Sequence, residues 1–269
     1  MGPFRGPEGA PYRTRAVRRS SVFSGGARWP VTGLGRARGV NGRPDAAMER
    51  PCVGSLSMSD MGGLRERKKA ETYRRLSETA VGLFLEHGFE RVTVADVAAA
   101  AGVSKPTLFR YFPAKEDLVL HRLADHEGEA GAVVAGRPPG CSPLGALRRH
   151  FLAGLDRRDP VTGLNDDPGV LAFHALLYGT PSLVARLHTH QERDEAALAE
   201  ALTPVDSEVG AGVGERLAAG QIVAVRRVLA QENWRLIAAG GRADDLAEKA
   251  TRVAEAAFDQ LCRGLPRLA

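Results

Sequence analysis

Residues 93–115, TVADVAAAAGVSKPTLFRYFPAK, contain two short helical patterns separated by one glycine. Thr93 stands where an N-cap belongs, and Asp96, three residues later, completes a capping box. Gly102 suits the left-handed conformation in which many helices end. The apolar stripe of the first helix, at helical spacing, consists of Val94, Val97 and Ala98.

A second helix is predicted directly after this turn. Ser104 is placed to cap it, and Pro106 falls in its first turn, where a missing N–H is tolerated. Leu108 and Phe112 are four residues apart and face inward. Two ordinary core helices around a glycine would give half of this pattern, but the outer face is basic, hydroxyl-bearing and aromatic, which fits a DNA major groove. The string therefore predicts a helix-turn-helix, with outward residues Lys105, Thr107, Arg110 and Tyr111.

Residues 67 to about 121 resemble the N-terminal domain of the TetR family of transcriptional regulators. The motifs that carry the resemblance are FLEHGFERVTVADVAAAAGVS and KPTLFRYFPAKEDLV. The family implies a DNA-binding regulator, most often a repressor, with double-stranded operator DNA, a second copy of the chain and a small-molecule effector as partners. It implies neither an enzyme nor a cofactor. The sequence itself shows no nucleophile–base pair, no paired carboxylates and no cofactor loop.

The resemblance also implies roles for individual residues. Lys105, Thr107 and Arg110 correspond to positions that contact base edges or lie near them. Pro106 and Tyr111 correspond to positions in apolar or phosphate contact. Phe109 stands where the family often has Tyr, and Ala95 where some members have a base-reading arginine. The complete predicted DNA-binding set is Thr93, Ser104, Lys105, Pro106, Thr107, Phe109, Arg110, Tyr111 and Lys115, with Thr93 and Lys115 as phosphate anchors.

A long helix is predicted ahead of this motif, from Arg67 to His87. Gly88 would end it and Phe89 would fold back onto Phe84, as in a Schellman stop. Its first turns are rich in Lys and Arg. They either reach the DNA backbone or form a solvated face balanced by neighbouring glutamates.

The net charge of +5 belongs mainly to the first 60 residues, where 10 Arg stand against 4 acidic residues. Residues 61–125 carry 11 basic and 9 acidic residues, and residues 126–269 carry 16 and 19. Residues 1–60 are rich in Gly, Pro, Arg and Ser and are predicted to be disordered. Three alternatives stay open for these residues: an auxiliary DNA tether, no role, or a segment that is not made. The last alternative arises because Met48, Met58 and Met61 all precede the motif and could each be the true start.

The rest of the chain is predicted to be helical, which makes the fold all-α, with a helix-turn-helix head at residues 61–122 and an effector-binding and dimerisation domain at residues 123–269. A fourth helix is expected in KEDLVLHRLADHEGE, residues 115–129, followed by a loose connection at residues 128–143. The further predicted helices are Pro143–Arg157, Pro168–Gly179, Pro181–Leu202, Val209–Ala239 and Ala243–Gly264.

The last two predicted helices are candidates for a homodimer interface, although they would also pack within one protomer. The expected faces are Ile222, Val225, Val228 and Leu229 on one helix, and Leu246, Ala250, Val253, Ala257 and Leu261 on the other. The helices between them would enclose an effector pocket. Its candidate residues are Phe151, Phe173, His174, Leu177, Tyr178, His188 and Trp234.

No metal site is predicted, because His188 and His190 are two apart on a helix and cannot face one ion together. The three cysteines, Cys52, Cys141 and Cys262, form no C-x-x-C pair and favour a reducing, cytoplasmic location. No apolar run approaches the length that crosses a bilayer.

The C-terminal half also resembles, faintly, the mycofactocin-regulator type within the family, which would imply an acyl or other hydrophobic effector. The alternative function is a helical ligand- or protein-binding module whose basic head serves a partner other than DNA.

Overall fold

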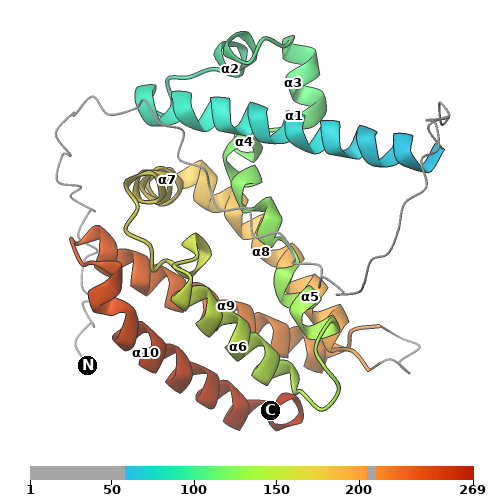
Figure 1. Cartoon of the computed structure of the whole chain (residues 1–269), viewed down its shortest axis with the longest axis vertical. Helices are drawn as coiled ribbons and strands as arrows, with labels where there is room; N and C mark the ends of the chain where they lie inside the picture. The colour runs from blue at the N-terminus through green and yellow to red at the C-terminus, as the bar shows by residue number, and fades with distance from the viewer. Residues whose placement is uncertain (1–57, 205–209) are drawn as a thin grey trace, which may run out of the picture. The chain divides into compact units, whose positions relative to one another are not determined.

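The computed structural model describes residues 58–204 and 210–269, apart from the side chains of residues 58–65, 124 and 125. In this part of the chain all regular structure is helical, which confirms the all-α prediction (Figure 1). The predictions about residues 1–57 lie outside it. The α-helices are α1 (Met58–His87), α2 (Val94–Ala100), α3 (Lys105–Tyr111), α4 (Asp117–Leu120), α5 (Glu129–Ala135), α6 (Pro143–Asp156), α7 (Pro168–Gly179), α8 (Pro181–Leu202), α9 (Val213–Ala238) and α10 (Ala243–Gly264), and the 3-10 helices are η1 (His121–His126), η2 (Pro160–Thr162) and η3 (Pro266–Leu268).

Helix α1 supports the N-terminal head. It begins at Met58 rather than at the predicted Arg67. At its end Gly88 adopts a φ of 88°, and its N–H donates to the Phe84 carbonyl at 2.9 Å. Phe89 folds back onto Phe84, with ring centroids 4.9 Å apart. The predicted glycine stop of this helix is therefore confirmed.

Helices α1 to α4 enclose one small apolar core. The Ser77 hydroxyl of α1 is buried and donates to the Leu118 carbonyl of α4 at 2.7 Å, so the hydroxyl is satisfied and the two helices are joined. This core holds α2 and α3 at fixed positions on α1. Its buried side chains include Leu76, Ala80, Val97, Leu108, Phe112 and Val119.

The segment after the head differs from its prediction. The single helix expected at residues 115–129 is divided into α4, η1 and the start of α5, with a break at Gly128, whose φ is 70°. The loose connection expected at residues 128–143 contains α5, which packs along α8. A Cβ added at Gly131 would lie only 2.9 Å from the Ala197 carbonyl oxygen of α8. The prediction was wrong because the small residues that suggested a loop serve here to let two helices approach closely.

Helices α6 to α10 form the rest of the described chain, and α10 packs against both α6 and α9 (Figure 1). Helices α7, α8 and α10 have the predicted bounds, α6 ends one residue early, and α9 begins at Val213 rather than Val209. Among the described residues, no single helix is long and apolar enough to cross a membrane. Helices α7 and α8 meet that requirement only jointly, across a bend of 94°.

The apolar faces predicted for dimerisation are used largely inside the protomer. Four of the nine residues predicted for the dimer interface are buried within the protomer, so the prediction was wrong for them. Helical spacing identifies an apolar face, but it does not reveal whether another helix of the same protomer or a second copy of the chain covers that face. By contrast, Val228 on α9 and Val253 on α10 are 54% and 46% exposed. Val213 and Leu217 are more exposed still and share one stripe of α9 with Val228. The four residues buried within the protomer are Ile222, Leu229, Ala250 and Leu261.

Candidate DNA-binding surface and ligand cavity

The turn between α2 and α3 is built from side-chain caps. Thr93 and Asp96 form the predicted capping box, in which the Asp96 N–H donates to the Thr93 hydroxyl at 3.2 Å and the Thr93 N–H donates to the Asp96 carboxylate at 2.8 Å. Gly102 has a φ of 66°, as the turn requires. The Ser104 hydroxyl then accepts from the Thr107 N–H at 3.2 Å and caps α3. These local bonds fix the orientation of α3 before any ligand is involved.

The outer face of α3 carries two cations beside aromatic rings. Lys105 and Arg110 are both exposed. The Lys105 ammonium lies 5.9 Å from the ring centroid of Phe109, which is 40% exposed, and the Arg110 guanidinium lies 5.7 Å from that of Tyr111. At exposed sites such contacts between a cation and a ring are attractive by about 0.5–1 kcal/mol. Together with exposed Pro106, they form a basic and aromatic surface on one short helix.

The other predicted DNA contacts have structural partners inside the head. Thr93 and Ser104 are exposed, but each hydroxyl serves a cap. Tyr111 packs edge-on against Tyr73 of α1, with centroids 4.8 Å apart. Lys115 was predicted as a phosphate anchor. Its ammonium donates to the Phe89 carbonyl and lies 4.2 Å from the centroid of the Phe89 ring. In this structure the Lys115 ammonium points into the head, where it holds the loop after α1.

Helix α4 is bonded to the C-terminal domain through one carboxylate. Asp117, the first residue of α4, accepts from Nε of Arg186 at 2.8 Å and from its Nη2 at 3.1 Å. The same carboxylate accepts the N–H of Ala114, in the connection from α3. A bidentate guanidinium–carboxylate pair fixes relative orientation as well as distance. The pair thus links α8 at Arg186 to the chain segment that follows α3.

A cavity of about 190 Å³ lies in the C-terminal domain, beside α8. Five of the seven predicted pocket residues line it. Phe173 does not, because it is fully buried beneath the Arg122 guanidinium, 5.6 Å from its ring centroid. His188 is exposed on α8, off the stripe on which Leu187, His190 and Gln191 face the cavity. The predicted residues that line the cavity are Phe151, His174, Leu177, Tyr178 and Trp234.

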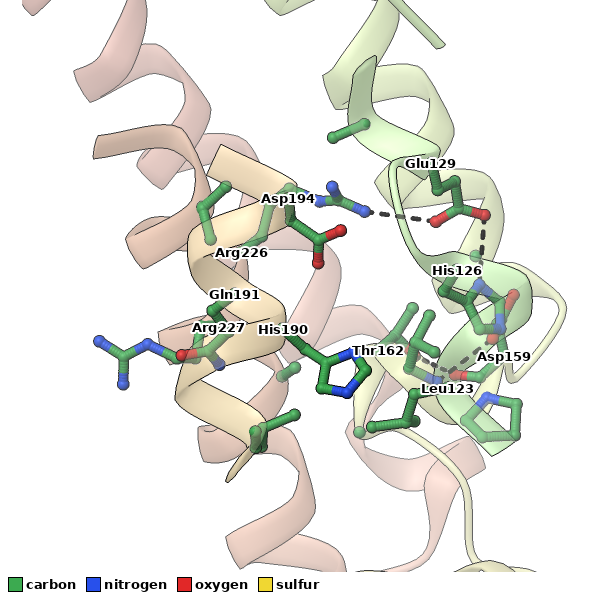
Figure 2. A pocket seen from close by; sticks show the side chains of 18 of the residues that line it. Leu123, His126, Glu129, Asp159, Thr162, His190, Gln191, Asp194, Arg226 and Arg227 are labelled. Atoms are coloured by element: carbon green, nitrogen blue, oxygen red, sulfur yellow. Dashed lines mark hydrogen bonds and ion pairs between the residues drawn. The ribbon is translucent and has the colours of Figure 1, made fainter. Parts of the chain in front are cut away.

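One wall of the cavity is a charged cluster around Glu129. One carboxylate oxygen of Glu129 lies 3.3 Å from Nδ1 of His126 and 3.2 Å from Nε2 of His150, and the other lies 3.5 Å from Nη2 of Arg226. Figure 2 shows the Arg226 guanidinium reaching toward Glu129, with Asp194 beside it. Asp194 also accepts the N–H of Gly128 at 2.7 Å. Segments far apart in the sequence thus meet at one carboxylate.

In this cluster burial disfavours the charged forms of Glu129 and Arg226, whereas their hydrogen bonds and ion pairs favour the charged forms. Burial alone would raise the pKa of Glu129, but hydrogen bonds from His126 and His150 hold it well below its usual range. Burial lowers the pKa of Arg226, while the charges of Glu129 and Asp194 act in the opposite direction. The cluster therefore presents a carboxylate and a guanidinium that already neutralise each other.

Another part of the cavity lining is aromatic. His174 and Tyr178, one turn apart on α7, have ring centroids 6.0 Å apart, and Trp234 of α9 lies 4.9 Å from Tyr178 and 6.4 Å from His174. Burial alone lowers the pKa of His174 to about 4, so its imidazole is neutral at neutral pH. Among the residues that the structure describes, Nδ1 of His174 and Nε1 of Trp234 are buried without a hydrogen-bond partner.

The buried imidazole of His174 should make the protein sensitive to mild acid. Its pKa is lower in the folded chain than the ordinary 6.5, so between pH 6.5 and about 4 only the unfolded chain takes up this proton. The stabilising contribution is complete above pH 6.5 and is lost as the pH falls toward 4. Lowering the pH from 7.5 to 5 should therefore reduce the unfolding free energy by roughly 2 kcal/mol. Urea unfolding at the two pH values measures this loss, and His174→Leu should abolish that share of it. Parallel pH profiles for both proteins would contradict the assignment.

Comparison with known proteins places these features in a family. Residues 76–121 match the family model described as bacterial regulatory proteins, tetR family. The HTH-type transcriptional regulator TcmR of Streptomyces glaucescens is 32% identical over 201 residues, which cover 74% of this chain and 86% of TcmR. MftR of Mycobacterium tuberculosis, named for the regulation of mycofactocin biosynthesis, is 45% identical over 87 residues, 32% of this chain and 44% of MftR. The solved structure of a transcriptional regulator from Pseudomonas aeruginosa PAO1 has a TM-score of 0.46 and 23% identity, covering 76% of this chain and 95% of that one.

The similarity to TcmR spans most of both chains, so it includes the C-terminal domain as well as the head. The similarity to MftR covers less than half of that protein and does not test the predicted likeness of the C-terminal half. Members of the family bind operator DNA, form dimers and bind small-molecule effectors, and they are not enzymes. The chain belongs to the TetR family of DNA-binding transcriptional regulators.

Proposed function

We propose that this regulator is a repressor that leaves its operator when a small molecule binds in the cavity. The observation that carries the proposal is the Arg186–Asp117 pair, which connects α8, a wall of the cavity, to α4. Because Asp117 also holds Ala114, a shift of α8 would change the position of α3. A ligand that binds more tightly to a conformer with displaced heads lowers the affinity for DNA by the difference in its binding energy.

On the DNA side, we propose that Lys105 and Arg110 contact base edges in the major groove. Both are exposed on α3, and a bidentate contact of this kind contributes about 1–3 kcal/mol of discrimination. The exposed ring of Phe109 is suited to apolar contact with a thymine methyl group. The capped N-terminus of α2 would approach a phosphate through its backbone N–H groups, with Thr93 beside it.

We also propose that the chain acts as a homodimer through the exposed apolar stripe of α9, Val213, Leu217 and Val228, together with Val253 of α10. These residues are roughly half exposed or more and have no role in the protomer core. Two heads in one dimer would present two α3 helices to half-sites about one DNA turn apart, ~34 Å.

Selection from a library of random double-stranded DNA tests these proposals. We expect enrichment of an inverted repeat with half-sites one turn apart, because a symmetric dimer binds a symmetric site. In fluorescence anisotropy with the enriched DNA, the logarithm of the binding constant should fall linearly with the logarithm of the salt concentration. Failure to enrich any sequence would refute the proposed function, and enrichment of a single half-site would refute the proposed dimer.

A further inference from the structure

The two walls of the cavity differ in what they leave unsatisfied. In the cluster around Glu129, the Glu129 carboxylate is already in contact with Arg226 and with the imidazoles of His126 and His150. On the aromatic wall, the described residues provide no partner for Nε1 of Trp234 or Nδ1 of His174. Among the described lining residues, the fully buried side-chain atoms that lack a hydrogen-bond partner are therefore both on the aromatic side.

We infer that the cavity takes a flat aromatic ligand that carries a hydroxyl or carbonyl oxygen next to Trp234 and His174, an inference that rests on the proposed function of the cavity as the effector site. The indole N–H only donates, so it requires an acceptor oxygen on the ligand. A neutral imidazole donates from one nitrogen and accepts at the other, so Nδ1 of His174 suits a hydroxyl in either tautomer. His174 is only 6% exposed, which leaves a group inside the cavity as the natural partner for this nitrogen.

The shape of the wall agrees with an aromatic ligand. His174, Tyr178 and Trp234 lie edge-on or tilted to one another, with centroids 4.9 to 6.4 Å apart. This is the range of distances in which aromatic rings pack favourably, and a further ring would extend the same arrangement. Leu177 and Phe151 add apolar surface to the lining.

The size of the cavity limits the ligand. An apolar cavity of about 150 Å³ holds one benzene molecule. The volume here is about 190 Å³, which is enough for a substituted ring or two fused rings. The hydrocarbon of a long acyl chain offers no hydrogen-bond partner to the two polar atoms on the aromatic wall, whereas a ring that carries an oxygen does. A carboxylate would instead be drawn to Arg226 and Arg227, which belong to other parts of the lining.

Isothermal titration calorimetry with four probes tests the inference on the full chain. The probes are 2-naphthol, 2-methylnaphthalene, decanoic acid and benzyltrimethylammonium, of which the first two share a shape and differ in the hydroxyl. We expect 2-naphthol to bind at least about tenfold more tightly than 2-methylnaphthalene, because only the hydroxyl can form a hydrogen bond with a buried polar atom of the aromatic wall. Tighter binding of decanoic acid or of the ammonium probe, or no binding of any probe, would overturn the inference.

The variant Trp234→Phe separates the hydrogen bond from the packing. It keeps an aromatic ring and removes the N–H, so the affinity for 2-naphthol should fall about tenfold while that for 2-methylnaphthalene stays nearly constant. Equal losses for both naphthalenes would mean that Trp234 acts only through packing, which also overturns the inference. Unchanged near-ultraviolet circular dichroism outside the indole band shows that the variant is folded.

The DNA measurement keeps this inference distinct from the proposed function. If 2-naphthol binds as expected but leaves the complex with the selected DNA intact, the ligand class stands and the proposed release mechanism fails. If no DNA sequence is enriched at all, the proposed function fails, while the calorimetric comparison still decides the chemistry of the cavity.

Discussion

A protein that carries both Lys105→Ala and Arg110→Ala should bind its selected DNA at least about 30-fold more weakly than the unchanged protein. Two lost base contacts at about 1–3 kcal/mol each sum to about 2–6 kcal/mol, which corresponds to a factor of about 30 or more. Both side chains are exposed and neither belongs to the head core, so the fold should be unaffected. Fluorescence anisotropy at one fixed salt concentration measures the change, since the comparison has meaning only at constant ionic strength.

A charge-matched control distinguishes base contact from general attraction. Arg137→Ala with Arg149→Ala removes two positive charges from exposed positions just before and on α6, away from the proposed dimer helices, and should change the affinity less than about threefold. The double substitution on α3 should weaken binding to the selected DNA far more than binding to random DNA, because phosphate contacts contribute equally on every sequence. Equal losses on both DNAs would place Lys105 and Arg110 on phosphates rather than on bases.

The head was predictable because its signals are local. The Thr93–Asp96 capping box, the left-handed Gly102 and the Ser104 cap each act within a few residues, so the sequence pattern and the structure coincide there. The contact of Lys115, by contrast, is not local. Its partner, the Phe89 carbonyl, lies 26 residues away in the chain, and no local pattern indicates that contact.

The cavity was predictable on its aromatic wall and not on its charged one. His174, Tyr178 and Trp234 stand out as polar aromatic residues on apolar helices. Glu129 lies in a stretch of small residues that suggested a loop, and it is separated by 97 residues from Arg226, with which it pairs. Only the packing of α5 against α8 brings these charges together, and that packing depends on the close approach at Gly131.

The substitution Gly163→Ala should destabilise the protein by about 3–5 kcal/mol, a large effect for one methyl group. Gly163 has a φ of 73°, where a residue with a Cβ is strained. The added Cβ would also lie 1.9 Å from the Ala230 carbonyl oxygen of α9, far closer than any real contact. The loop after η2 would have to move away from α9, and the buried bond at 2.9 Å from the Asn233 amide to the Thr162 carbonyl would be lost.

Urea unfolding of Gly163→Ala and of a second glycine variant measures whether this effect is specific. Gly82 lies on an exposed face of α1 with no atom within 4 Å of an added Cβ, so Gly82→Ala should raise the unfolding free energy by roughly 0.5–1 kcal/mol. The two variants add the same methyl group, and the expected changes in unfolding free energy have opposite signs. Because Gly163, Ala230 and Trp234 all line the cavity, loosening this loop should also weaken 2-naphthol binding. A Gly163→Ala protein within about 1 kcal/mol of the unchanged one would show that the η2 loop is not held against α9.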